Sequence, residues 1–150
     1  MNICFVCHAN ICRSFSAQEL LKKFLSEKNR RDINVFSRGI FAQSYFSVPS
    51  KITEFLKEEN ILFDGHCAAL LSGADMQKAD LILVMTEDQL DYLLDKYSEF
   101  SDKIYLLLDY AYGEEKDLED PISKSGRAFY KTMEKLKRAV KAVADKLTEN

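Results

Sequence analysis

The chain has 150 residues, 47% hydrophobic and 30% charged, a composition typical of a globular protein with a core of its own. We therefore expect one domain over residues 1–150. The net charge of −3 argues against nucleic acid or an anionic membrane as the main partner. No apolar run approaches the roughly 18 residues of a membrane span, and no export signal is evident. These features predict a cytoplasmic protein whose four cysteines are free thiols.

The predicted elements alternate between strands and helices. Short apolar runs indicate the strands, and apolar residues at helical spacing indicate the helices. In chain order these are a strand over 2–7, a helix over 14–29, a strand over 33–37, a helix over 49–60, a strand over 81–85, a helix over 86–97, a strand over 104–108 and a last helix containing 129–147. Arg38-Gly39 is expected to end the second strand, Thr86 is a predicted N-cap, and 113–126 is a polar segment. This alternation predicts an α/β fold with a parallel sheet covered by helices on both faces.

The most informative segment lies between the first strand and the first helix, where Cys7 and Arg13 enclose a five-residue loop. A loop at a helix N-terminus directs backbone N–H groups and the positive end of the helix dipole toward one point, which makes an anion site. Arg13 adds a planar fork that can bind two phosphate oxygens. Cys7 at the base of such a site is expected to ionise readily and to act as a nucleophile.

These residues carry a family resemblance that covers most of the chain. Cys7, Asn10, Cys12, Arg13 and Ser14 match the pattern Cys-x-Gly-Asn-x-Cys-Arg-Ser-Pro of the low-molecular-weight protein tyrosine phosphatases. An Asp-Pro pair, the second signature of that family, follows at 120–121. Between the two signatures, the segment 37–39 is similar to the family's Ser-Ala-Gly after the second strand, and the segment 80–85 is similar to its third strand.

The resemblance implies a three-layer α/β fold with the sheet order 2-1-3-4 and the phosphate loop after strand 1. It implies hydrolysis of protein phosphotyrosine through a phosphocysteine, without metal or cofactor. Phosphotyrosine-containing proteins, and a cognate tyrosine kinase, are then the expected partners of a monomeric enzyme.

The same resemblance assigns the catalytic roles. Cys7 is the expected nucleophile, and the Ser14 hydroxyl is expected to hydrogen-bond its sulfur. Arg13 is expected to hold the phosphate together with the backbone of His8, Ala9, Asn10, Ile11 and Cys12. Asp120 is the expected general acid, which then serves as the base that activates water.

Further residues have supporting roles by resemblance. Asn10, Ser37 and His66 are expected to brace the phosphate loop by hydrogen bonds. Cys12 is a candidate redox guard that forms a reversible disulfide with an oxidised Cys7. The candidates for the substrate cleft are Phe41, Tyr45, Phe46 and Ile122.

The sequence departs from the family pattern at three places. Ala9 replaces a glycine where the backbone must curve around phosphate, and Phe15 replaces a proline. Ile122-Ser123 stand where an aromatic pair often follows the Asp-Pro signature. The first two changes bear on the geometry of the loop, and the third bears on the wall for an aromatic substrate.

Other functions compete with phosphotyrosine hydrolysis. Arginine phosphatases of the same superfamily usually carry threonine where this chain has Ile11, which favours tyrosine. A phosphate pocket with slow chemistry would serve as a phosphopeptide-binding module, although binding needs neither Cys7 nor Asp120. Arsenate reductases require a late cysteine pair, and no cysteine follows Cys67.

The cysteines also match two kinds of motif found outside the phosphatases. Cys4-x-x-Cys7-His8 matches a haem-attachment or thioredoxin-type motif, but residues 4 and 7 of one strand should point to opposite faces. A zinc site built from Cys4, Cys7, Cys12 and His66 is disfavoured on similar grounds, because four convergent ligands need a knuckle.

Overall fold

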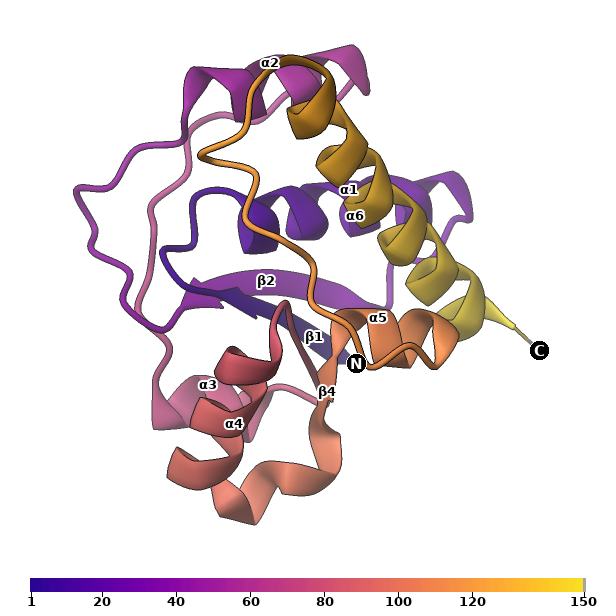
Figure 1. The fold of residues 1–150 in the computed structure, drawn as a ribbon. Helices are drawn as coiled ribbons and strands as arrows, with labels where there is room; N and C mark the ends of the chain where they lie inside the picture. Colours follow the sequence, from indigo (N-terminus) through magenta and orange to yellow (C-terminus); the bar gives the residue numbers. More distant parts are fainter. Residues whose placement is uncertain (150) are drawn as a thin grey trace.

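A computed structural model describes residues 1–149 and contains one four-stranded sheet (Figure 1). The strands are β1 (Asn2–Cys7), β2 (Asn34–Gly39), β3 (Leu81–Val84) and β4 (Ile104–Leu106). They run parallel in the order β2-β1-β3-β4. The predicted α/β class and sheet order are therefore confirmed. In such a sheet the loops that follow the strands meet at one edge, where ligands bind.

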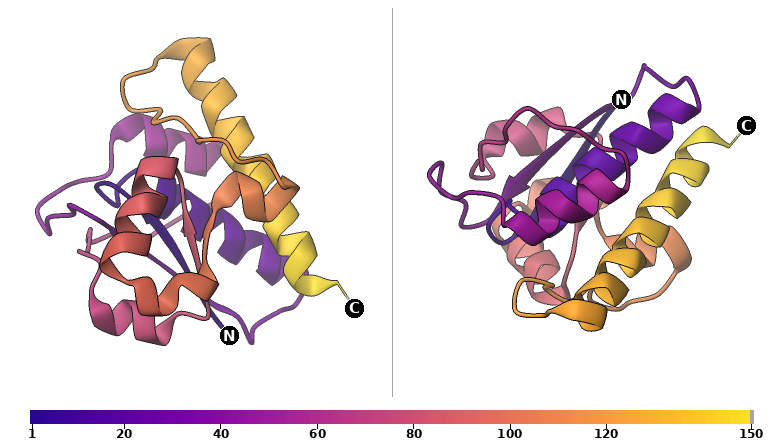
Figure 2. Two further views of the ribbon diagram at one scale, coloured as in Figure 1. Left: turned by 60° about the horizontal axis from the view of Figure 1, so that its bottom comes forward. Right: turned by 90° about the horizontal axis from the view of Figure 1, so that it is seen from above.

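Helices cover both faces of the sheet. In chain order they are α1 (Arg13–Glu27), α2 (Ser50–Glu58), α3 (Gly73–Lys78), α4 (Glu87–Lys96), the 3-10 helix η1 (Ser98–Lys103), α5 (Leu107–Tyr112) and α6 (Gly126–Thr148). Helices α1, α2 and α6 lie above the sheet in Figure 1, and α3 and α4 lie below it. Figure 2 shows α1 and α6 side by side. None of the helices over residues 1–149 has the length and apolar character needed to cross a membrane.

The central strand β1 contributes to two separate cores. Ile3, Phe5 and Cys7 pack into the core beneath α1 and α6, whereas Cys4 and Val6 pack into the core beneath α3 and α4. This alternation is the period-two pattern of a strand that is buried on both faces. Cys4 and Cys7 therefore lie on opposite sides of the sheet, and the haem-attachment and thioredoxin-type interpretations of their spacing have no geometric support.

The structure corrects several predicted boundaries. Strand β2 continues through Arg38 and Gly39, which pair with Val6 and Cys7, because the parallel ladder supplies partners that local propensity did not indicate. The run predicted as a strand over 104–108 divides after Leu106, and its last two leucines begin α5 and pack into the core with α6. Helices α3 and η1 were not predicted, since each is only six residues long.

Candidate functional site

The phosphate-loop segment connects the end of β1 to the start of α1. Cys7 is the last residue of β1, and Arg13 is the first residue of α1. Cys12 occupies the N-cap without forming a side-chain cap, and the first turn of α1 contains no acidic residue. By contrast, Thr86 caps α4, as predicted, and the structure adds a complete capping box with Gln89. The N–H groups at the start of α1 therefore have no side-chain acceptor and can bind an external anion.

Residues far apart in the sequence close one cavity above Cys7. The cavity has a volume of about 140 Å³. Its lining residues come from the phosphate loop and from the segment that precedes α6: Cys7, His8, Ala9, Ile11, Cys12, Arg13, Asp120 and Ile122. Cys7 is only 3% exposed, so it lies at the base of the cavity. The predicted nucleophile, cation and general acid are thus in one place.

Arg13 joins the phosphate loop to the segment that carries Asp120. Its Nη1 donates a hydrogen bond to the Leu118 carbonyl at 2.8 Å, and its Nη2 lies 3.8 Å from Asp120 Oδ2. The Arg13 side chain is 7% exposed, whereas that of Asp120 is 48% exposed. One N–H group of the guanidinium therefore holds the segment that carries Asp120 in place, while the Asp120 side chain remains accessible at the rim of the cavity.

Leu118 anchors the acidic segment, and its role was not predicted. Its side chain is buried, and its N–H donates to the Met85 carbonyl at 2.8 Å. Two residues later, Asp120 Oδ1 accepts a hydrogen bond from the Ile122 N–H at 3.0 Å. Within the segment 113–119 Leu118 is the one large apolar side chain, and this pattern is the signal that could have identified it.

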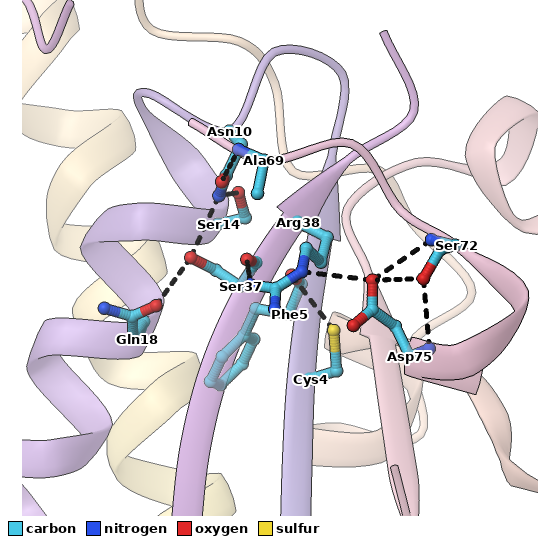
Figure 3. A network of polar contacts seen from close by, with 10 residues as sticks. All are labelled: Cys4, Phe5, Asn10, Ser14, Gln18, Ser37, Arg38, Ala69, Ser72 and Asp75. Atoms are coloured by element: carbon cyan, nitrogen blue, oxygen red, sulfur yellow. Dashed lines mark hydrogen bonds and ion pairs between the residues drawn. The ribbon is translucent and has the colours of Figure 1, made fainter. Parts of the chain in front are cut away.

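Asn10 connects the phosphate loop to α1, to β2 and to the segment that contains Ala69. Its φ angle is 62°, the left-handed conformation that asparagine tolerates. The side-chain Nδ2 donates to Ser14 Oγ and to Ser37 Oγ, each at 2.9 Å, and Oδ1 accepts from the Ala69 N–H at 3.0 Å (Figure 3). Asn10 is fully buried, and these bonds use both Nδ2 protons and give Oδ1 a donor.

Ser14 Oγ lies 2.9 Å from Cys7 Sγ. Because this oxygen already accepts a hydrogen bond from Asn10, its own proton is available to the sulfur. A donated hydrogen bond stabilises a thiolate, which is the charged form needed for attack.

His66 also supports the phosphate loop, through the Asn10 backbone. Its Nε2 donates to the Asn10 carbonyl at 2.7 Å, and burial lowers the pKa of the imidazole below 6.5. The ring stacks on Phe15 with centroids 4.0 Å apart, and Phe63 meets Phe15 edge-on at 4.9 Å. Phe15, which replaces the family proline, thus packs directly against a loop-supporting residue.

Gly39 lies directly under the phosphate loop. A Cβ atom at this position would lie 2.7 Å from the His8 carbonyl oxygen and 2.9 Å from the Asn10 nitrogen. The neighbouring N–H groups of Ile40 and Phe41 donate to the carbonyls of Cys7 and His8 at 2.9 and 2.8 Å. The glycine is therefore required by a close backbone approach.

Ala9 does not adopt the left-handed conformation. Among residues 1–149, the non-glycine residues with positive φ are Asn10, Asn29 and Asn60. Ala9 therefore has a negative φ, which does not require glycine. The left-handed residue of the loop is Asn10 instead.

The aromatic candidates for the substrate cleft occupy three different places. Phe41 is 56% exposed and packs against His8 with ring centroids 4.9 Å apart, so it borders the cavity. Tyr45 is 79% exposed and packs edge-on against Phe46. Phe46 lines a larger hollow of about 450 Å³ that contains His66 but none of Cys7, Arg13 and Asp120. Of the four candidates, Ile122 alone lines the cavity itself.

Cys12 is a buried thiol that lines the cavity beside Cys7. Burial, followed by the negative charge of Asp120 and the proximity of Cys7, raises the pKa of the Cys12 thiol to about 12. The Cys12 thiol is therefore protonated near neutral pH. Residues 1–149 contain no group of three or more His, Cys, Asp or Glu side chains placed to hold a metal ion.

Comparisons with known proteins agree with this geometry. The model of the family "Low molecular weight phosphotyrosine protein phosphatase" matches residues 2–150. The chain is 30% identical to a protein-arginine-phosphatase of Bacillus subtilis, with 100% of this chain and 99% of the relative covered. It is 31% identical to the low molecular weight protein-tyrosine-phosphatase PtpA of Staphylococcus aureus, with 81% and 78% covered.

A solved structure, the low molecular weight protein tyrosine phosphatase from T. tengcongensis, is similar with a TM-score of 0.90 and 32% identity. That similarity covers 97% of this chain and 99% of the solved one. The family match, the full-length relative and the cavity above Cys7 lead to one conclusion: the chain belongs to the low molecular weight phosphotyrosine protein phosphatase family.

Proposed function

We propose that this protein hydrolyses phosphotyrosine in proteins through a phosphocysteine formed on Cys7. The observation that carries the proposal is the convergence of Cys7, Arg13 and Asp120 on one narrow cavity at the uncapped start of α1. Phosphoryl transfer depends mainly on positioning and on electrostatic stabilisation of the phosphoryl oxygens. The backbone N–H groups of the loop and the Arg13 guanidinium supply both.

In the first step the Cys7 thiolate attacks phosphorus, so an S–P bond forms while the P–O bond to the tyrosine ring breaks. The leaving phenoxide has a conjugate acid with a pKa of about 10 and needs a proton near neutral pH. Asp120, half-exposed at the rim of the cavity, supplies that proton from its carboxylic acid form. The products are the dephosphorylated tyrosine side chain of the substrate protein and phosphocysteine.

In the second step the Asp120 carboxylate removes a proton from a water molecule, which attacks the phosphocysteine. A P–O bond forms, the S–P bond breaks and inorganic phosphate is released. The departing sulfur is again a thiolate, and the hydrogen bond from Ser14 Oγ, 2.9 Å away, stabilises it. Asp120 and Cys7 return to their starting protonation states.

The walls of the cavity support an aromatic substrate. Ile11 and Ile122 present apolar side chains beside the phosphate site, and such walls suit the face of a phenyl ring. Because Cys7 lies at the base of the cavity, a short phosphoserine side chain would not bring its phosphate to the sulfur. The depth of the site thus favours phosphotyrosine over phosphoserine.

Phosphoarginine is the second candidate substrate, since one relative that matches the whole of the chain is a protein-arginine-phosphatase. A guanidine leaving group presents several N–H donors. Ile11 offers these donors no acceptor, which is the physical reason for placing tyrosine first. The substitution Ile11→Thr should raise the activity on phosphoarginyl peptides relative to that on phosphotyrosyl peptides.

The proposal is tested by hydrolysis of para-nitrophenyl phosphate in the presence of EDTA and reductant. We expect Cys7→Ser to abolish turnover while phosphate still binds. The matched control is Cys67→Ser, because Cys67 is exposed and lies outside the cavity. Turnover of Cys7→Ser near the wild-type rate would refute the nucleophile.

The outcome for the wild type also separates an enzyme from a binding module. If vanadate and phosphotyrosyl peptides bind but no substrate is hydrolysed, the chain is a phosphopeptide reader. If turnover is found, paired rates on phosphotyrosyl and phosphoarginyl versions of one peptide decide the substrate. A cytoplasmic location, a monomeric state and a cognate tyrosine kinase remain part of the proposal.

A further inference from the structure

The hydrogen bonds beneath the phosphate loop continue beyond Asn10 to Gln18, a residue that does not line the cavity (Figure 3). Gln18 lies one helical turn after Ser14 on α1. Its Oε1 is 2.6 Å from Ser37 Oγ, and Ser37 Oγ is 2.9 Å from Asn10 Nδ2. Ser37 is 2% exposed, so its hydroxyl has little access to water.

The direction of each hydrogen bond near Cys7 follows from the structure. The Ala69 N–H can only donate, and it points to Asn10 Oδ1. Asn10 Nδ2 must therefore donate both of its protons, one to Ser14 and one to Ser37. Ser14, which accepts from Asn10, keeps its own proton for Cys7 Sγ.

The orientation of the Gln18 amide is set in the same way. Its Nε2 donates to Glu19 Oε2 at 3.0 Å, and Glu19 forms an ion pair with Lys22 at 3.6 Å, which keeps Glu19 an acceptor. Gln18 Oε1 therefore faces Ser37 and accepts the Ser37 proton. Without that acceptor, the Ser37 hydroxyl would turn its proton toward Asn10. Asn10 Nδ2 already donates to Ser37 Oγ, so two donors would then face each other.

We propose that Gln18 is a positioning residue: by accepting the Ser37 proton it keeps Asn10 donating to both serines and Ser14 donating to the Cys7 sulfur. This inference rests on the proposed function only in taking Cys7 as the reactive thiol. Gln18 does not touch the substrate, and it acts through Ser37 and Asn10.

The test measures the thiolate of Cys7 directly, without turnover. The rate of alkylation by iodoacetamide is followed from pH 4 to pH 9, and fragmentation of the tryptic peptide 1–13 locates the label on Cys7 rather than on Cys4 or Cys12. The substitution Gln18→Met keeps the length of the side chain but removes the acceptor. We expect the pH midpoint of alkylation to rise and kcat/KM at pH 6 to fall by about two- to tenfold, the range of one hydrogen bond.

Two variants separate this effect from general damage. Gln18→Glu retains an oxygen acceptor and should restore kcat/KM to within about threefold of the wild type. Gln77→Met changes an exposed glutamine on α3 in the same chemical way and should leave the midpoint unmoved. A lower Tm of Gln18→Met with an unchanged midpoint would show a purely structural role and overturn the proposal.

A double-mutant cycle tests the route through Ser37. If Gln18 acts through that hydroxyl, Gln18→Met should have no further effect on the midpoint in a Ser37→Ala background. Independent, additive shifts would overturn the inference. A wild type without phosphatase activity whose alkylation midpoint still responds to Gln18→Met would refute the proposed function and leave this inference standing.

Discussion

The substitution Gly39→Ala tests whether β2 positions the phosphate loop. Gly39 is the last residue of β2 and pairs with Cys7. An added Cβ would lie 2.7 Å from the His8 carbonyl oxygen, 0.7 Å closer than the 3.4 Å at which ordinary contacts begin. It would also lie 2.9 Å from the Asn10 nitrogen. Both neighbours are backbone atoms of the loop, so the loop itself must move.

The expected cost has two parts. Overpacking of this kind typically destabilises a protein by about 1–3 kcal/mol, which for a chain of this size corresponds to a Tm lower by roughly 2–12 °C. Displacement of the N–H groups that hold the phosphate should also lower kcat/KM, since a shift of about 1 Å at a reacting centre can cost about 100-fold. We expect a loss of at least about tenfold for Gly39→Ala, together with weaker inhibition by inorganic phosphate.

The matched control is Gly73→Ala. Gly73 begins α3, and no atom lies within 4 Å of an added Cβ at this position. Differential scanning calorimetry and steady-state kinetics on both variants should therefore separate them clearly. If Gly39→Ala has the kcat/KM and phosphate inhibition of the wild type, the loop is not held by the close approach of β2.

Three further predictions concern Asp120, Cys12 and His66. Asp120→Asn should slow hydrolysis of phosphotyrosyl peptides by about 10²–10⁴-fold and affect substrates with acidic leaving groups much less; equal losses on both would exclude a general acid. Hydrogen peroxide should oxidise the Cys7 thiolate to a sulfenic acid, which the Cys12 thiol then converts to a disulfide with release of water. Mass spectrometry should detect the linkage, and Cys12→Ala should make inactivation irreversible; recovery of Cys12→Ala with reductant equal to that of wild type would count against the guard. Burial lowers the pKa of His66 in the folded protein below 6.5, so at acidic pH the unfolded chain binds more protons at His66 than the folded protein does. The contribution of neutral His66 to the free energy of unfolding is therefore complete above pH 6.5 and is lost as the pH falls. Urea unfolding between pH 7.5 and 5 should show a smaller loss for His66→Gln than for wild type, and equal losses would contradict this linkage.

The predictions that the structure confirmed most fully rest on residues that are close together in the sequence. The strand that ends at Cys7, the loop and the helix that starts at Arg13 form one continuous segment, so their order alone predicts an anion site. The alternation of apolar strands with helices predicts a parallel sheet in the same way, from consecutive segments of the chain. The order of its strands was predicted from the family resemblance. Family membership, predicted from the phosphate-loop residues and Asp120-Pro121, is confirmed by the match over residues 2–150.

Boundaries were less predictable where a neighbouring element supplied the deciding partner. Arg38 and Gly39 have weak strand propensity, yet they extend β2 because Val6 and Cys7 supply ladder hydrogen bonds. Leu107 and Leu108 continue an apolar run, yet they form a helix because their side chains pack against α6. In both cases tertiary contacts outweighed local preference.

The sequence by itself determined which chemical groups meet at the site. Within seven residues it places a thiol beside a guanidinium and a helix N-terminus, and the positive potential of the last two acts on the thiol because all three are local in the chain. The tertiary structure alone decided how that chemistry is held in place. The distance between Arg13 and Asp120 depends on the burial of Leu118, and the direction of the hydrogen bond to Cys7 depends on Ala69. Such contacts join segments about 60 to 110 residues apart, and no local pattern encodes them because they form only when the core packs.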